Sequence, residues 1–236
     1  SIAFFKITAT ILIIGASSGM GKQLALQLSS ENHVYATYMK SFSADLENVS
    51  FHYLDVLSPQ PDIDFIPDIL HGFVYCPGSI TLKPFSKLSL NDFESDFQIN
   101  FLGIVKLLHQ ILPNLRRAEQ ASVVLFSSVA VQLGMPFHSS IAASKGAIEG
   151  FTRAMAAEFS PKIRVNAIAP SLTDTPLAES LINTEVKLMN MASKHPLQRI
   201  GKPEDIAHMV EFLLSNKSSW ITGQIFHIDG GMGVIK

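Results

Sequence analysis

Three glycines, Gly15, Gly19 and Gly21, stand where the apolar run TILII gives way to a segment of helical period. At such a turn the backbone can approach a bound group, and the N-terminus of the helix offers free N–H groups and a positive dipole end. We expect Gly15 to allow the tight turn, Gly19 to let the backbone approach a pyrophosphate, and Gly21 to permit close helix contact. Because ordinary turns and caps also use glycine, the hypothesis of a phosphate site depends on the strand before it and the helix after it.

The rest of the chain supplies elements that could position such a site. Short apolar runs bounded by turn residues predict strands at 10–16, 33–38, 49–56, 71–76, 122–128, 163–170 and 224–231. Longer periodic segments predict helices at about 19–30, 91–116, 143–160 and 203–215. Near-continuous apolar strands are typical of a parallel sheet covered on both faces. The predicted fold class is therefore α/β, a single Rossmann-type doubly wound parallel sheet with helices on both faces.

Length and composition indicate one domain, residues 1–236, because 236 residues with 47% apolar side chains can bury one large core. Residues 171–200 combine prolines and polar residues with scattered Met and Leu, which predicts a mobile helical flap over a ligand. Its part at 176–197 would line the substrate pocket, and the Leu and Met residues there favour an apolar ligand.

The charge balance and the cysteine count exclude several classes of partner. A formal net charge of −2, without long runs of either sign, argues against nucleic acid and against an anionic membrane surface. The single cysteine, Cys76, leaves no Cys/His cluster at zinc spacing, so no metal is expected. The opening run SIAFFKITATILIIGA could belong to a signal peptide, but it passes directly into the glycine turn and indicates a buried strand instead. We expect a soluble, cytoplasmic protein.

Several motifs resemble those of the short-chain dehydrogenase/reductase family over nearly the whole chain. The glycine spacing G-x-x-x-G-x-G is similar to that of this family, and PLQRIGKPEDIAHMVEFLLSNKSSWITGQIFHIDGG resembles its 3-oxoacyl-carrier-protein reductase branch. HYLDV resembles the family's adenine-contacting Asp-Val, while IRVNAIAP with SLTDTPL resembles the segment flanking the nicotinamide. The resemblance implies cofactor contacts from Gly15, Ser17, Ser18, Gly19, Met20, Gly21, Lys40, Asp55, Val56, Gly78, Lys145, Pro170, Thr173 and Thr175.

The choice between the two nicotinamide cofactors depends on the segment after the second predicted strand. VYATYMKSF contains no carboxylate to bind the adenosine 2′-hydroxyl of NAD, whereas Lys40 could face the 2′-phosphate of NADP. Lys40 could equally be a solvated surface lysine, and Ser17 and Ser18 occupy the stretch that is often basic in NADP-preferring members. We therefore favour NADP(H) over NAD(H) and leave NAD(H) open.

The family reaction transfers a hydride between nicotinamide and a carbonyl or alcohol carbon while a proton moves at the oxygen. In the family a tyrosine moves that proton, a lysine four residues later lowers its pKa and binds ribose, a serine holds the substrate oxygen and an asparagine anchors a water relay. By resemblance, Asn100, Ser128 and Lys145 take three of these four roles. Their alternatives are a helix hydrogen-bonding residue, a turn serine and an exposed lysine, respectively.

The tyrosine position holds Ile141, counted four residues before Lys145 or thirteen after Ser128. Isoleucine has no exchangeable proton, so it cannot act as the acid or base. Two further departures surround the cofactor: YCPG at 75–78 replaces the family's Asn-Asn-Ala-Gly, and Ser171 replaces the usual glycine after Pro170.

Three functions remain open from these residues. The first is a working NAD(P)(H)-dependent oxidoreductase of a small carbonyl or alcohol substrate, with His138, or Ser128 and a water held by Lys145 and Asn100, as the proton donor. The second is a catalytically inactive NAD(P)-binding sensor or regulatory partner subunit, and the third is a structural subunit with an empty pocket. In each case helices 91–116 and 143–160 carry apolar residues on more than one face, which favours a homodimer or homotetramer.

Overall fold

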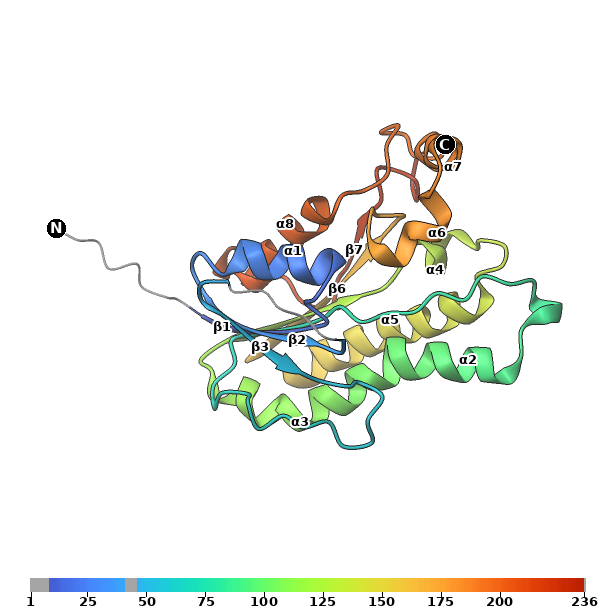
Figure 1. The fold of residues 1–236 in the computed structure, drawn as a ribbon. Helices are drawn as coiled ribbons and strands as arrows, with labels where there is room; N and C mark the ends of the chain where they lie inside the picture. The colour runs from blue at the N-terminus through green and yellow to red at the C-terminus, as the bar shows by residue number, and fades with distance from the viewer. Residues whose placement is uncertain (1–8, 41–45, 236) are drawn as a thin grey trace.

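The computed structural model describes residues 9–40 and 46–235, and in this part of the chain seven parallel strands form one sheet (Figure 1). The strand order is β3-β2-β1-β4-β5-β6-β7. The chain therefore starts at the centre, builds one half outward to β3, and crosses back to build the other half from β4. The strands are β1 Thr10–Ile14, β2 His33–Tyr38, β3 Val49–Tyr53, β4 Gly72–Tyr75, β5 Ala121–Phe126, β6 Ile163–Pro170 and β7 Ile225–Ile228. The predicted fold class is confirmed.

Helices cover both faces of this sheet (Figure 1). Helices α1 and α8 pack together on one face, and α2, α3 and α5 lie on the other. The α-helices are α1 Gly19–Leu28, α2 Leu90–Phe97, α3 Gly103–Arg117, α4 Val129–Leu133, α5 Ser139–Phe159, α6 Glu179–Ile182, α7 Glu185–Ala192 and α8 Pro203–Leu214. Short 3-10 turns occupy Phe85–Lys87, Pro176–Ala178 and Asn216–Ser218.

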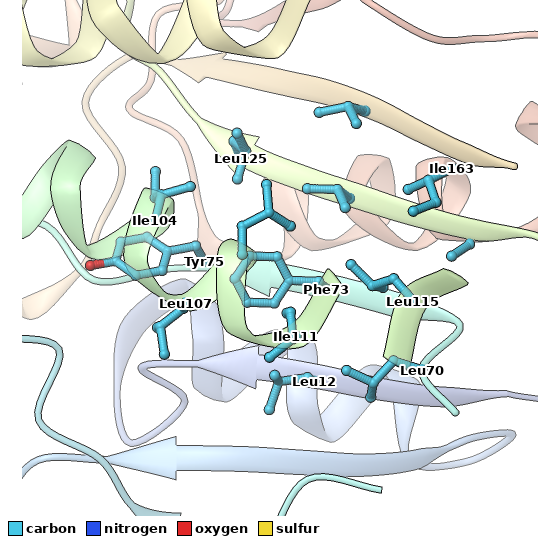
Figure 2. Packing of buried hydrophobic residues seen from close by; sticks show 14 of the residues in the cluster. Leu12, Leu70, Phe73, Tyr75, Ile104, Leu107, Ile111, Leu115, Leu125 and Ile163 are labelled. Atoms are coloured by element: carbon cyan, nitrogen blue, oxygen red, sulfur yellow. The ribbon is translucent and has the colours of Figure 1, made fainter. Parts of the chain in front are cut away.

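The alternation of side chains along the central strands divides the interior into two cores. Ile11 and Ile13 of β1 point into the core beneath α1 and α8. Leu12 and Ile14 point to the other face, where they join a cluster with Phe73 and the apolar side of α3 (Figure 2). Burial of each such side chain stabilises the fold by about 1.5–3 kcal/mol. A strand that is apolar on both faces is what this architecture requires.

The helix predicted at 91–116 is not continuous. A π-helical segment, Gln98–Leu102, separates α2 from α3. The Tyr75 hydroxyl, at the end of β4, donates a hydrogen bond of 2.7 Å to the carbonyl oxygen of Ile99 in that segment. Gly103 leaves room for the phenol, because a β-carbon there would collide with the Tyr75 hydroxyl. A buried side chain from a distant strand thus occupies the wider turn, and helical periodicity alone does not reveal such an insertion.

The structure also refines the predicted helix at 143–160 and the predicted flap at 171–200. Helix α5 begins at Ser139 rather than residue 143, and α4 was not predicted. The predicted flap contains α6 and α7, so its helical content is confirmed, and both helices lie at the same end of the molecule as the C-terminus (Figure 1). The first eight residues of the apolar opening run lie outside the described part, whereas Thr10–Ile14 is a strand. None of the described helices is long and apolar enough to cross a membrane.

Candidate active site

The turn between β1 and α1 forms a cradle of backbone atoms. Gly15 and Gly19 have φ of +76° and +54°, values that side chains disfavour, and a β-carbon on Gly21 would collide with the carbonyl oxygen of Gly15. Ser18, at the N-cap of α1, makes no side-chain capping bond, and the first turn of this helix carries no acidic residue. The N–H groups at the start of α1 are therefore free to bind an anion, and the helix dipole favours one.

A cavity of about 300 Å³ opens beside this turn. It lies at the carboxyl ends of β1, β2 and β4, where the winding of the sheet reverses, which is the usual ligand position in doubly wound folds. The flap contributes Thr175, Pro176 and Leu177 to its wall. The other lining residues are Ile14, Gly15, Ser17, Ser18, Gly19, Met20, Gly21, Thr37, Tyr38, Met39, Leu54, Val56, Leu57, Cys76, Pro77, Gly78 and Ile99.

The residues around this cavity suit the phosphates and a base of a dinucleotide. Side chains on the glycines would fill the cradle, as a β-carbon on Gly19 would lie 3.4 Å from Thr175 of the flap. The uncapped start of α1 suits phosphate groups, and the apolar side chains of Val56 and Leu57 provide a wall for a base. In the described part of the chain no group of three or more His, Cys, Asp or Glu could hold a metal ion.

Two consecutive serines at the end of β5 point to different partners. The Ser127 hydroxyl is buried and donates to the carboxylate of Glu149 at 2.7 Å. Ser128 is half-buried, and its hydroxyl oxygen accepts the N–H of Ala130 at 3.2 Å at the start of α4. Because that bond uses the oxygen of Ser128, its O–H remains able to donate to a substrate oxygen.

Lys145 reaches the same region from α5. Its Nζ donates to the carbonyl oxygen of Phe126 at 2.8 Å. Burial lowers the pKa of Lys145 to about 8, while Cys76 and Asp96 act in the opposite direction. The neighbouring thiol of Cys76 has its pKa raised to about 12 by burial, so it is protonated at neutral pH. Lys145 thus remains mostly an ammonium at pH 7 in a poorly solvated position.

Asn100 lies in the π-helical segment and is fully buried. Its amide nitrogen donates to the backbone oxygen of Asp96 at 2.8 Å and to the Ser79 hydroxyl at 3.0 Å. A β-carbon on Gly78 would lie 3.2 Å from Asn100 Oδ1 and 4.0 Å from Lys145 Nζ. Asn100 and Lys145 therefore converge behind Gly78, which is part of the cavity wall.

Ile141 lies one turn before Lys145 on α5 and is 4% exposed. The hydroxyl of Tyr75 donates its hydrogen bond to the Ile99 carbonyl, so it is not available as a proton donor in the site. Figure 2 shows the Tyr75 ring in the core beside Ile104. The ring Nδ1 of His138, at the N-cap of α5, lies 2.7 Å from the carbonyl oxygen of Pro136, and His138 does not line the cavity.

Known proteins share both the sequence pattern and the fold. A family described as enoyl-(acyl carrier protein) reductase matches residues 66–233. The 3-oxoacyl-(acyl-carrier-protein) reductase FabG of Thermotoga maritima is 29% identical over 238 residues, which cover 94% of this chain and 96% of that protein. The chain belongs to the short-chain dehydrogenase/reductase family. The predicted family and its similarity to 3-oxoacyl-carrier-protein reductases are thereby confirmed.

Solved structures of short-chain dehydrogenases/reductases agree. The ligand-free aldohexose dehydrogenase of Thermoplasma acidophilum superposes with a TM-score of 0.90 at 26% identity, covering 100% of this chain and 98% of the other. ElxO with NADP bound gives a TM-score of 0.84 at 27% identity, covering 95% and 98%. The relatives are oxidoreductases, and a nicotinamide dinucleotide is the ligand of a close structural neighbour.

The structure brings most of the predicted site residues to one place. Those lining the cavity are Gly15, Ser17, Ser18, Gly19, Met20, Gly21, Val56, Gly78 and Thr175. The predicted residues that do not line it are Lys40, Asp55, Asn100, Ser128, Lys145, Pro170 and Thr173, although Asn100 and Lys145 lie behind Gly78 of its wall. The Asp55 carboxylate accepts the N–H of Leu57 at 2.8 Å, and the Thr173 hydroxyl donates to the carbonyl of Ser171 at 3.0 Å. Cofactor contact stays a prediction for all of the residues named, those that line the cavity included.

Sequence reasoning did not nominate two residues beside this site. Asp96 is 1% exposed and accepts hydrogen bonds from several hydroxyls, and Ser79 joins it to Asn100. The signal in the sequence was slight: an acidic residue four positions before Asn100 on an amphipathic helix, where a carboxylate normally faces solvent.

Proposed function

We propose that the protein is an NAD(P)(H)-dependent oxidoreductase that transfers a hydride between nicotinamide and a small carbonyl or alcohol substrate, with Ile141 in place of the usual tyrosine. The observation that carries this proposal is the convergence of Lys145 and Asn100 behind Gly78, a residue that lines the same cavity as the glycine turn. A nucleotide cradle alone would support binding only.

The chain's own residues divide the work. The backbone of the glycine turn and the start of α1 would hold the phosphates of the cofactor, and Lys145 its ribose. Nicotinamide, when bound, donates or accepts the hydride. Ser128 would donate its free O–H to the substrate oxygen and so orient the carbonyl. A water held by Ser128, Lys145 and Asn100 would exchange the proton at that oxygen.

The rate expected from this arrangement is low. A positioned general acid typically contributes about 10²–10⁴-fold, and Ile141 cannot supply one. Positioning of cofactor and substrate still lowers the barrier, so slow turnover is expected rather than none. We retain His138 as a second candidate donor.

We propose NADP(H) over NAD(H). Tyr38 and Met39 line the cavity at the end of β2, with no carboxylate at positions 37–40, and the exposed Lys40 follows them. Positive charge there favours a 2′-phosphate, and the neighbour ElxO has NADP bound. A Lys40→Ala variant should lose affinity for NADPH and keep its affinity for NADH.

We propose an apolar carbonyl or alcohol as substrate. Leu177 of the flap lines the cavity and is 51% exposed, and the flap also exposes Val186 and Met189.

We further propose a cytoplasmic homodimer or homotetramer. Helix α5 exposes a row of small side chains, at Ala143, Gly150, Ala154 and Ala157, which lets another helix approach closely between the exposed Arg153 and Glu158. Light scattering coupled to gel filtration measures this assembly.

The second candidate function is a catalytically inactive NAD(P)-binding sensor or regulatory subunit, and the burial of Ile141 at the proton-transfer position favours it. One experiment separates the two. The purified protein is titrated with NADPH and NADH by fluorescence, and acetoacetyl thioesters and a panel of ketones are then added while nicotinamide absorbance is followed. Binding with turnover supports the oxidoreductase, binding without turnover supports the sensor, and absence of binding refutes both.

A further inference from the structure

Asp96 is a carboxylate inside the protein. It lies on α2 and is 1% exposed, whereas the neighbouring residues of that helix, Glu94 and Ser95, face solvent. A buried carboxylate is costly unless hydrogen-bond donors surround it. The structure therefore has to supply such donors, and the segments that carry them are the ones that Asp96 links together.

Three hydroxyl groups donate to Asp96. Ser79 donates to Oδ1 at 2.6 Å and Thr81 to the same atom at 3.2 Å, both from the loop after β4. Ser140 donates to Oδ2 at 2.7 Å from the first turn of α5. A carboxylate without a proton can only accept, which matches three donating hydroxyls. Asp96 thus joins α2, the loop after β4 and the start of α5.

The same three segments carry the site. Ser79 follows Gly78 of the cavity wall, Ser140 precedes Ile141, and Asn100 lies one turn after Asp96. The Asn100 amide donates both to Ser79 Oγ and to the Asp96 backbone. The carboxylate is therefore one hydroxyl away from Asn100, which itself lies behind Gly78 opposite Lys145.

The charge of Asp96 also reaches Lys145, whose pKa it raises against the effect of burial. The other titratable groups nearby are accounted for in the described part of the chain. Cys76, from the end of β4, is protonated at neutral pH because burial raises its pKa to about 12. On α5 the Glu149 carboxylate accepts the Ser127 hydroxyl and lies 3.7 Å from Arg153. On α2, Asp92 pairs with Lys83 at 2.8 Å near the surface.

We propose that Asp96 is a positioning residue of the hydride-transfer site: its carboxylate fixes Ser79 and Ser140 around Asn100, and its negative charge stabilises the ammonium of Lys145. This inference rests on the proposed function, since it assigns Lys145 and Asn100 to the site. A hydroxyl cluster with a purely structural role would need hydrogen-bond acceptors at position 96 but no charge. Charge and hydrogen bonding can be separated at nearly the same volume. Asparagine can keep its oxygen toward Ser79 and Thr81, while its NH2 donates to the Ser140 hydroxyl, which also lies 3.4 Å from the Asp92 carbonyl.

The test compares Asp96→Asn with Glu94→Gln, which removes the same charge from an exposed position on the same helix. The Lys145 pKa is read directly, by the pH dependence of its acetylation with acetic anhydride followed by peptide mass spectrometry. We expect the Lys145 pKa to fall in Asp96→Asn, because the carboxylate raises it, and to stay unchanged in Glu94→Gln. NADPH affinity at pH 8 should fall several-fold in Asp96→Asn alone. An unchanged Lys145 pKa in a folded Asp96→Asn protein overturns the proposal.

A second variant covers a failure of Asp96→Asn to fold. Ser79→Ala retains the carboxylate and removes the hydroxyl between it and Asn100, so NADPH affinity should fall several-fold at an unchanged Lys145 pKa. Wild-type affinity in Ser79→Ala would overturn the positioning role. Because acetylation needs no cofactor, it tests the role of Asp96 separately from the proposed function. If the wild type binds neither NADPH nor NADH, the proposed function fails while the effect of Asp96 on Lys145 is still measured.

Discussion

Replacement of Lys145 by methionine should stabilise the folded protein. Burial lowers the Lys145 pKa from 10.5 to about 8. Each unit corresponds to about 1.36 kcal/mol, so holding the ammonium in the folded state costs about 3 kcal/mol near pH 7. Methionine has a similar length and removes that cost, but it also removes the 2.8 Å bond to the Phe126 carbonyl, which is worth about 1 kcal/mol. A net gain of about 2 kcal/mol in the free energy of unfolding remains.

The sign of the pH dependence follows from the same numbers. The folded-state pKa of Lys145 lies below its unfolded value, so the cost is complete below about pH 8 and disappears as the pH rises toward 10.5. The advantage of Lys145→Met should therefore be largest at pH 7 and vanish near pH 10.5. Because both proteins share all other titrating groups, the difference between them isolates this lysine.

Urea unfolding of both proteins across this pH range measures the difference. Lys217→Met, an exposed lysine in a 3-10 turn, is the matched control and should change stability by less than about 0.5 kcal/mol. NADPH binding should weaken in Lys145→Met and stay unchanged in Lys217→Met. A Lys145→Met protein that is less stable than wild type at pH 7 would refute the reasoning, because the ammonium would then not be held at a cost.

Three further predictions concern the proton donor, the glycine turn and the flap. Ile141→Tyr should raise kcat above that of Ile141→Phe, toward the factor of about 10²–10⁴ that a general acid contributes, whereas equal rates would show that the hydroxyl does not reach the reacting oxygen. Gly21→Ala should lower the free energy of unfolding by about 1–3 kcal/mol and weaken NADPH binding more than about tenfold, because its β-carbon would meet only backbone atoms. Gly150→Ala is the control: nothing lies within 4 Å of its β-carbon, so it should stabilise α5 slightly. Calorimetry measures both effects. Ser171→Ala should raise the rate of proteolytic cleavage in the flap. The Ser171 hydroxyl lies 2.8 Å from His195 Nε2, and His195 Nδ1 lies 2.9 Å from the Met191 carbonyl, so the hydroxyl links the start of the flap to α7 through His195. Unchanged cleavage would show that this hydrogen bond does not hold the flap in place.

The sheet and the glycine turn were predictable because their signals are local. Apolar runs such as TILII can be buried on both faces only within a covered parallel sheet, and Gly15 and Gly19 mark a turn that few other residues can adopt. Asn100, Ser128 and Lys145 were placed by their spacing along recognisable motifs. The partners of Lys145 and Asn100, the Phe126 carbonyl and the Ser79 hydroxyl, belong to distant parts of the chain, and no spacing in the sequence encodes those contacts.

The features that were not predicted depend on long-range contacts. The π-helical segment accommodates a phenol that arrives from β4, more than twenty residues earlier in the chain. Asp96 has the sequence context of a solvent-facing acidic residue, and only the meeting of α2 with α5 and the loop after β4 buries it. Each effect requires knowing which helix face meets which loop. Periodicity assigns a helix but does not assign its neighbours.

The contact between Tyr75 and Gly103 constrains the order in which mutations at these two positions can be accepted. A β-carbon at position 103 would meet the Tyr75 hydroxyl, so a side chain there requires the buried phenol to move and should be tolerated better in a chain that has already lost Tyr75. A smaller residue at position 75 removes the hydrogen bond to the Ile99 carbonyl, which lowers the stability of the π-helical segment. A side chain added at position 103 can then fill the space that the phenol occupied. Mutational paths through this pair should therefore begin more readily at the strand than at the helix, and a library that varies position 103 alone should be enriched in glycine.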